Sequence, residues 1–436
     1  MIASFLLSFT TIVKFDFLLY IAYIVLAAYF FIAVSKKYFY YFVIFYFLFS
    51  ILFNLPDQLI IISNVIYDRY IELIIFFIAL KIIIGRNVNL FSDIYFKLIL
   101  SYTFIGILSG IANSNPIVSI IFFIKTPLLL YFIYIIFYHS TTNLFLEKIY
   151  PFMISYWLAQ PFIIILQNNL LKDKLYWYQG AFMDFFGGSM GYANTQQVSI
   201  FSSLMWLFLI SNKKISKNIK ILATVTFPLI SIFASAGGGI IIFLITLVTY
   251  LLFKSNLNKF ISIFSIIGVI ITFYFIIPQI TAEHHRGFNF YDSIIQGNYT
   301  FFINSQTSNE RGRIYMMRYL TNKLNDESSI LIGKGPFSVR GSRYFESSSS
   351  LFTTRAVASE IQLQYGELGI LGYLIILIMF IYPIMKLKTS RIIKTLSVFV
   401  LFAGSIYGLI FTSMFFIVNY WILLSLYKGG FYEQGH

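Results

Sequence analysis

The sequence contains no cysteine, which excludes disulfides, thiolate metal sites and a cysteine nucleophile. Charged residues are also scarce, at 11% of the 436 residues, whereas hydrophobic residues make up 59%. A soluble domain of this size could not bury so much apolar surface. The first apolar run has neither a basic start nor a small-residue cleavage site, so we expect no cleaved signal peptide.

Repeated apolar runs of about 20 residues predict an all-α polytopic integral membrane protein. We expect about thirteen transmembrane helices by this length criterion, and the shorter run at residues 2–13 would be a fourteenth. No internal repeat is apparent, which disfavours an inverted-repeat transporter. The predicted runs are 17–34, 38–54, 68–84, 97–112, 117–138, 150–167, 193–211, 219–235, 237–253, 260–279, 365–385, 393–411 and 412–428.

The net charge of +14 would suit a nucleic-acid partner, but its distribution favours a different explanation. Lysines form short clusters between apolar runs, for example at 213–220 and 386–394. This is the pattern of cytoplasmic loops in membrane proteins. We therefore expect a lipid bilayer as the partner of this chain, and no nucleic acid.

The lysine clusters orient the chain and divide it into three parts. N-terminal transmembrane helices occupy 1–280 and include a short outer loop at 168–192. A large outer loop follows at 281–364, and further transmembrane helices occupy 365–436. The large loop is the longest break in the hydropathy, and loops of this length usually carry function.

Arginine is concentrated in the large outer loop, whereas the cytoplasmic clusters are almost entirely lysine. The planar guanidinium fork suits phosphate and carboxylate groups, so this segregation predicts an anion site. A solvated surface of mixed charge is the alternative. The arginines of the loop are Arg286, Arg311, Arg313, Arg318, Arg340, Arg343 and Arg355.

Residues 307–324 carry three of these arginines in a helical pattern. If the segment is a helix, Ser308 or Asn309 is its expected N-cap, and Arg313 opens the first turn. The free N–H groups of a helix start would reinforce an anion site there. An ordinary amphipathic surface helix explains the same pattern.

Two other short motifs carry little chemistry. Gly333-Lys334-Gly335 lacks the spacing of a nucleotide-binding loop and predicts a tight turn with close backbone approach. The adjacent His284 and His285 would point in opposite directions on an extended chain, and no second ligand pair accompanies them. We therefore expect no metal, no nucleotide and no other cofactor.

Lys125 stands eight residues into the apolar run 117–138. A charge at such a depth costs roughly 2.5–3.5 kcal/mol on insertion scales, so Lys125 should face the protein interior or a wet cavity. Pro127 can kink this helix and open its backbone. Snorkelling of the lysine to the interface is the alternative.

The segment that opens the run 365–385 carries acidic residues at its start. Glu360, Gln364 and Glu367 fall at i, i+4 and i+7, on one face of a helix. A carboxylate on a rigid helix near the outer interface suits a general base for a lipid-linked substrate. A headgroup-level anchor would more naturally be Trp, Tyr or Lys. A glycine stripe in this segment would let another helix approach closely. It comprises Gly366, Gly369 and Gly372.

This combination of many spans, a late outer loop and outer arginines resembles the O-antigen polymerase (Wzy) family and, more distantly, the O-antigen ligases. The architecture matches over the whole chain, and the residue-level similarity covers about 80 residues. Arg355 is followed, after ten residues, by Gly366, an Arg-x10-Gly spacing described for some of these polymerases. The other matching segments are 308-SNERGRIYMMRYL-320, 331-LIGKGPF-337 and 359-SEIQLQYGELGILGYL-374.

Departures from the family pattern refine the resemblance. Ligases usually carry a His-Asn pair where this chain has Ser359-Glu360, which favours a polymerase. Some polymerases have arginines in the earlier outer loop, where this chain offers only Lys172 and Lys174. Asn194 sits where the family often has a polar Asn before the next span.

The resemblance implies a glycosyltransferase of GT-C-type architecture whose active site faces the periplasm from the bacterial inner membrane. It would transfer a growing glycan from undecaprenyl diphosphate to the non-reducing end of a lipid-linked repeat unit. Arg313 would bind the diphosphate leaving group. Glu360 would be the base, or would orient one. The further substrate-binding candidates are Arg311, Arg318, Arg355, Lys125 and Asn194.

Two other functions remain open on the sequence. An O-antigen ligase would use the same donor and deliver the glycan to lipid A–core. A polysaccharide flippase should carry charges through several spans, whereas this chain gathers its charge in one loop. For a polymerase, a flippase and a chain-length regulator are the expected protein partners.

Overall fold

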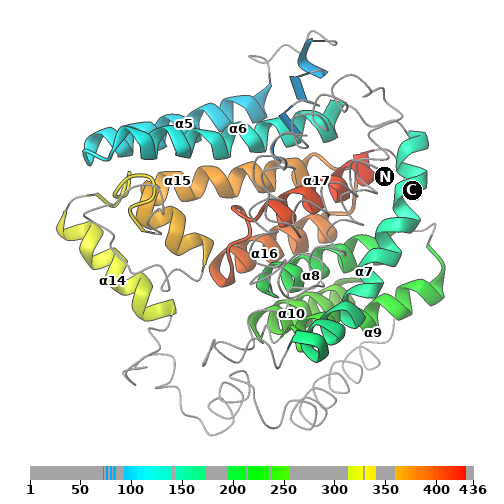
Figure 1. Ribbon diagram of the computed structural model, residues 1–436. Helices are drawn as coiled ribbons and strands as arrows, with labels where there is room; N and C mark the ends of the chain where they lie inside the picture. The colour runs from blue at the N-terminus through cyan, green and yellow to red at the C-terminus, as the bar shows by residue number, and fades with distance from the viewer. Residues whose placement is uncertain are drawn as a thin grey trace, which may run out of the picture.

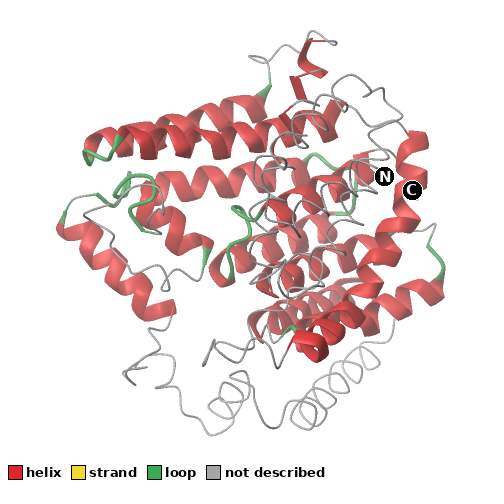
Figure 2. Cartoon of the chain, viewed as in Figure 1, coloured by secondary structure: helices red, strands yellow, loops and turns green. Residues whose placement is uncertain are grey.

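The computed structural model describes eight stretches of the chain, in which every regular element is a helix (Figures 1 and 2). The predicted all-α architecture is therefore confirmed for these residues. Isolated helical positions between 72 and 84 are also described. The stretches are 93–139, 143–171, 195–212, 215–234, 237–254, 313–327, 329–339 and 359–428.

The apolar runs predicted within these stretches each coincide with one helix. The predicted runs 17–34, 38–54 and 260–279, and residues 2–13, lie outside the described residues. The helices are α5 (Ile94–Ala112), α6 (Ile117–His139), α7 (Asn143–Leu171), α8 (Thr195–Ser211), α9 (Lys217–Phe233), α10 (Gly237–Lys254), α14 (Arg313–Asp326), α15 (Glu360–Met385), α16 (Arg391–Tyr407) and α17 (Met414–Lys428).

Three of these helices are long and apolar enough to cross a membrane: Ile94–Ala112, Ile117–Phe137 and Glu360–Met385. Shorter apolar helices accompany them at Tyr150–Leu166, Gly238–Phe253 and Phe416–Tyr427. A hydrocarbon core about 30 Å thick needs about 20 helical residues, so length and composition fit an α-helical membrane protein.

Helix α8 lies at the centre of the bundle and packs against α9, α10 and α16 (Figure 1). Its residues from Gln197 to Leu209 are all buried, the small polar serines among them included, as expected for a helix enclosed by others. Helix α5 instead exposes Leu100, Phe104 and Leu108 on its outer face. Large apolar side chains on the outside are what a lipid environment permits.

Helix α15 is broken at Gly369 into the segments 360–368 and 370–385, which Figure 1 shows meeting at an angle. Gly369 has φ 69° and ψ −170°, a conformation that is essentially restricted to glycine. The break leaves the last carbonyls of the first segment without N–H donors from the helix, and the first N–H groups of the second segment without carbonyl acceptors from it.

The turn at 330–335 supplies both sets of missing partners. Lys334 N and Gly335 N donate to Gly366 O and Glu367 O at 3.0 and 2.8 Å. On the other side of the break, Ile370 N donates to Ile330 O at 3.0 Å, and Leu371 N donates to Leu331 O at 3.3 Å. Residues 330–335 thus replace the missing turn of the helix ladder.

Glycines in the turn 330–335 and at the break in α15 allow the two backbones to come this close. Gly333 and Gly335 have φ values of 69° and 93°, so the predicted tight turn with close backbone approach is confirmed. A Cβ on Gly369 would lie 2.3 Å from the carbonyl carbon of Leu331. We expected the glycine stripe to admit another helix, but at Gly369 it admits this turn, because only a non-helical backbone can pair with the freed groups.

Helix α14 packs on the first segment of α15 through a small apolar cluster that is separate from the main core. Leu320, Val339 and Leu363 are its buried members, and Met317 and Leu409 pack against them. The cluster, which we call the α14 cluster, joins four segments: α14, the turn 329–339, the start of α15, and the loop between α16 and α17. It places the predicted arginine helix beside the predicted acidic segment.

The element boundaries differ from those predicted in three places. Helix α15 begins at Glu360, so the last residues of the predicted loop 281–364 form its first turn. Helix α16 ends at Tyr407, and residues 408–413 form a loop where two abutting runs were predicted. Helix α14 begins at Arg313, and the N-cap predicted at Ser308 or Asn309 lies outside the described residues.

Candidate functional site

Glu360 is the first residue of α15 and is fully buried, with an exposed fraction of 0%. Its backbone N–H donates to Gly408 O at 3.0 Å, which ties the helix start to the loop 408–413. The positive end of a helix favours a carboxylate in its first turn. The hydrogen bond to Gly408 and the positive end of the helix together hold Glu360 where α15 meets the loop 408–413.

The Glu360 carboxylate accepts hydrogen bonds on both oxygens. Oε2 accepts from Phe411 N at 3.0 Å, from Thr412 N at 3.3 Å and from Thr412 Oγ1 at 3.2 Å. Oε1 accepts from Gln364 Nε2 at 2.7 Å. A carboxylate has about four lone-pair sites, so these four donors meet most of its hydrogen-bonding capacity, and Oε2 is the more crowded oxygen.

Gln364 connects Glu360 to helix α5. The Tyr102 hydroxyl donates to Gln364 Oε1 at 2.7 Å, and both side chains are buried. This bond fixes the Gln364 amide so that its Nε2 faces Glu360. The predicted polar face of α15 is thus buried, since Glu360, Gln364 and Glu367 all lie inside the protein.

The first turn of α8 also contacts the loop 408–413. Gln197 Nε2 donates to Leu409 O at 3.0 Å. A Cβ on Gly408 would lie 2.9 Å from Gln196 Oε1, so the loop passes close to the start of α8 here. Asn194, a predicted substrate contact directly before α8, lies outside the described residues.

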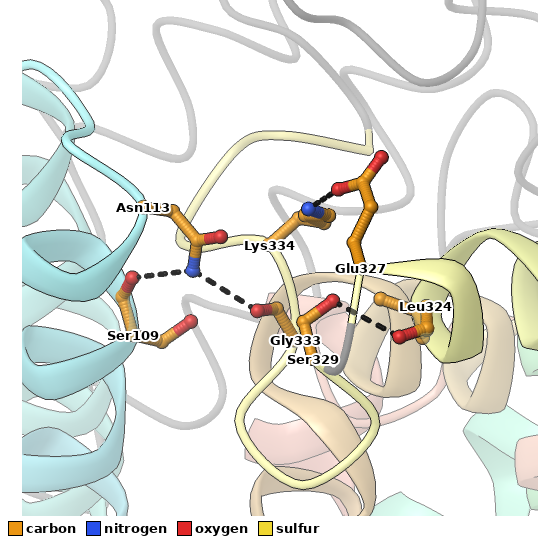
Figure 3. Close-up of polar contacts among 7 residues, drawn as sticks. All are labelled: Ser109, Asn113, Leu324, Glu327, Ser329, Gly333 and Lys334. Carbon is orange, nitrogen blue, oxygen red and sulfur yellow. Dashed lines mark hydrogen bonds and ion pairs between the residues drawn. The ribbon is translucent and has the colours of Figure 1, made fainter.

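The turn 329–339 is anchored to the end of α5 and to the end of α14 (Figure 3). Asn113 Nδ2 donates to Ser109 O at 2.8 Å and to Gly333 O at 3.0 Å. Lys334 forms an ion pair with Glu327, directly after α14. Partial burial and the nearby Lys323 lower the pKa of the Lys334 ammonium. The turn, α14 and the first segment of α15 therefore form one interlocked unit.

The two arginine positions of α14 lie on different faces of the helix. Met317, Leu320 and Leu324 form the stripe of α14 that faces the protein. The backbone position of Arg313 falls within about 40° of this stripe, one turn before Met317, whereas Arg318 lies about 100° around from Met317. Position 313 therefore continues the face that packs toward α15.

Two other predicted arginines, Arg311 and Arg355, lie outside the described residues. What the structure does bring together is the α14 helix, whose first residue is Arg313, and the segment that begins with Glu360. The α14 cluster is the contact between them.

Lys125 lies eight residues into α6 and forms an ion pair with Glu72, with Nζ 2.6 Å from Oε1. Their side chains are 38% and 19% exposed. We predicted that Lys125 faces the protein interior or a wet cavity; its side chain is partly exposed and is paired with a carboxylate. Sequence reasoning did not identify Glu72 as the partner, because the two positions lie 53 residues apart.

The most informative contacts missed by sequence reasoning come from the loop 408–413. Its backbone N–H groups bind Glu360, yet its sequence, 408-GLIFTS-413, is mostly apolar and was assigned to transmembrane runs. Only Gly408 directly after a helical run and the pair Thr412-Ser413 could have indicated a break there.

Within the described stretches, no group of three or more His, Asp or Glu side chains could hold a metal ion. Comparison of the whole chain with models of known protein families found no match. No curated protein matches the chain either. The geometry of the site is therefore the basis for assigning a function.

Proposed function

We propose that this chain is an O-antigen polymerase, a GT-C-type glycosyltransferase of the bacterial inner membrane that acts at the periplasmic face. The observation that supports it best is the meeting of two segments. A buried carboxylate opens α15, and the helix that begins with Arg313 packs against the same segment through the α14 cluster.

The proposed reaction moves the growing glycan from undecaprenyl diphosphate to a hydroxyl of the lipid-linked repeat unit. The acceptor oxygen forms a bond to the anomeric carbon, and the bond from that carbon to the phosphate oxygen breaks. The electron pair leaves with undecaprenyl diphosphate, and the proton of the acceptor hydroxyl passes to a base. No metal or nucleotide is needed in this scheme, because a diphosphate is already a good leaving group.

Arg313 stabilises the charge that develops on the leaving diphosphate. A guanidinium offers two parallel donors to phosphate oxygens, which a lysine cannot. Its position on the packed face of α14 favours it over Arg318 for this role. Arg311, Arg355 and Asn194 are further contacts of the substrate in this proposal, and Lys125 is a phosphate contact that Glu72 holds in the absence of substrate.

Glu360 is the proposed base. Its hydrogen bonds set a condition on that role: Thr412 or Gln364 gives up its place on the carboxylate, so that a Glu360 oxygen can accept from the acceptor hydroxyl when the substrate binds. Hydrogen bonds at catalytic groups commonly rearrange when the substrate complex forms. A carboxylate that only orients the loop 408–413 would not need to release a donor.

The test of the overall proposal is deletion and complementation in the source bacterium, read on a lipopolysaccharide gel. Loss of a polymerase leaves core bearing a single repeat unit. Loss of a ligase leaves bare core, and loss of a flippase leaves precursor undelivered on the cytoplasmic side. Either of the last two phenotypes would contradict the proposal.

The arginine assignment is tested with a matched pair on α14. Removing one donor from the site of a developing negative charge costs about 100-fold or more, so Arg313→Ala should abolish the ladder. Arg318→Ala, on the same helix but off the packed face, should retain most of it. Arg313→Lys keeps the charge but loses the fork. A full ladder from that variant would exclude a bidentate contact.

A further inference from the structure

Two buried polar atoms beside Glu360 have no hydrogen-bond partner among the described residues: Ser359 Oγ and Gln197 Oε1. Ser359 is 1% exposed and Gln197 is 6% exposed. A buried polar group without a partner costs about 1–3 kcal/mol. No described residue satisfies either atom, so both are available to a ligand.

Both residues adjoin the same loop, from different helices. Ser359 precedes Glu360, whose backbone N–H donates to Gly408 O at 3.0 Å. Gln197 reaches the next residue, since its Nε2 donates to Leu409 O at 3.0 Å. The amide of Gln197 is therefore fixed by one atom, and its carbonyl oxygen is the atom left over. Residues 408–412 bring Ser359 and Gln197 to the neighbourhood of the Glu360 carboxylate.

The chemistry of these atoms selects the ligand. The Gln197 carbonyl oxygen only accepts hydrogen bonds, so it disfavours a phosphate or a carboxylate, and Glu360 repels an anion further. The Ser359 hydroxyl can both donate and accept. A neutral hydroxyl suits each atom, because it can donate to Gln197 Oε1 and accept from Ser359 Oγ.

We propose that Ser359 and Gln197 form a subsite for a carbohydrate hydroxyl, distinct from the diphosphate contact on α14. Its identification as the acceptor-sugar subsite rests on the proposed polymerase function. The subsite holds a hydroxyl of the acceptor beside Glu360, and thereby sets which sugar is presented to the base. Ser359 and Gln197 are thus specificity-determining residues, and the diphosphate is recognised elsewhere.

Ser359→Ala is a clean probe, because the hydroxyl that it removes bonds to no described residue. A purely structural role predicts unchanged or higher thermal stability, since an unsatisfied buried group is lost. Ser397→Ala is the matched control. Ser397 is also fully buried and its Oγ also has no partner among the described residues, but it lies on α16 away from the loop 408–413.

The measurement is binding of the repeat-unit oligosaccharide, released from its lipid by mild acid, to the purified full-length protein in detergent. Saturation-transfer NMR reports binding without requiring catalysis. We expect Ser359→Ala to weaken binding by roughly three- to tenfold, the size of one neutral hydrogen bond. Gln197→Met should weaken it similarly, and Ser397→Ala should not change it.

The subsite would be excluded if the wild-type protein failed to bind the oligosaccharide. Equal binding by Ser359→Ala and wild type, or equal weakening by Ser397→Ala, would exclude it as well. Weakened binding in Ser359→Ala supports the subsite even if the deletion strain lacks the polymerase phenotype. In that case the polymerase assignment is wrong and the carbohydrate site stands.

Discussion

Replacement of Glu360 by glutamine separates a chemical role from a structural one. Glu360→Ala would leave the donors of Phe411, Thr412 and Gln364 unsatisfied, each at a cost of about 1–3 kcal/mol, so loss of activity could reflect loss of folding. Glutamine has nearly the same shape and keeps one carbonyl oxygen. The structure shows how the network can accommodate it.

The carbonyl oxygen of the introduced glutamine would face Phe411 N and Thr412, so its NH₂ would face Gln364. Gln364 would then turn its amide over and present its carbonyl oxygen. The NH₂ of Gln364 would face Tyr102, whose hydroxyl can accept as well as donate. The amide groups of this network keep partners, whereas the Tyr102 O–H loses its acceptor on Gln364. The cost is the difference between charge-assisted and neutral hydrogen bonds, about 1–3 kcal/mol in total.

For the proposed polymerase with Glu360 as its base, we expect Glu360→Gln to be expressed and folded but to give no O-antigen ladder, because an amide cannot accept the proton of the acceptor hydroxyl. Expression is measured by immunoblot of membranes, and folding by thermal melting in detergent. Glu367→Gln is the matched control: Glu367 is also buried, on the same face of α15, and its variant should retain the ladder. A full ladder from folded Glu360→Gln would refute the base role and leave Glu360 as an organiser of the loop 408–413.

Three further outcomes follow from the contacts around the site. Gly369→Ala should destabilise the protein by about 3 kcal/mol or more, because backbone strain of about 1–3 kcal/mol adds to the overlap with Leu331. A melting temperature no lower than that of Gly366→Ala would contradict this. Asn113→Ala should cost about 1–2 kcal/mol and speed hydrogen exchange of the turn that it anchors, so unchanged exchange in the 329–339 segment would refute the anchoring role. Lys125→Met and Glu72→Gln should each lower the melting temperature, but together by less than their sum, and strict additivity in this double-mutant cycle would show that the ion pair is not coupled.

The features that could be predicted from sequence are those that depend on neighbouring residues. The apolar runs predicted the helices, because a helix in lipid must satisfy its own backbone and present apolar side chains. The i, i+4, i+7 spacing placed Glu360 and Gln364 on one face, since 3.6 residues make a turn. The tight turn at Gly333 and Gly335 was predictable because only glycine takes those φ values at no cost.

Features that depend on contacts between distant segments were not predictable. The donors to Glu360 come mostly from the apolar loop 408–413, where two of them are backbone N–H groups, and a backbone donor has no sequence signature. Glu72 lies far from Lys125 in the sequence, and only the packing of the helices brings the two side chains together. The kink at Gly369 could not be predicted from the sequence for the same reason. A helix can break in a membrane only where another segment pairs with its freed backbone groups, and here that segment is the turn 330–335.

Hydropathy and periodicity are local properties, so the apolar helices of the protein and the residue types available for chemistry follow from its sequence. Which of these residues meet depends on how distant segments pack. The tertiary structure joined α14 to the start of α15 through the α14 cluster and enclosed Glu360 in hydrogen-bond donors. It also left Ser359 Oγ and Gln197 Oε1 without partners among the described residues beside it. Burial and hydrogen bonding are properties of the packed chain, and they define this site.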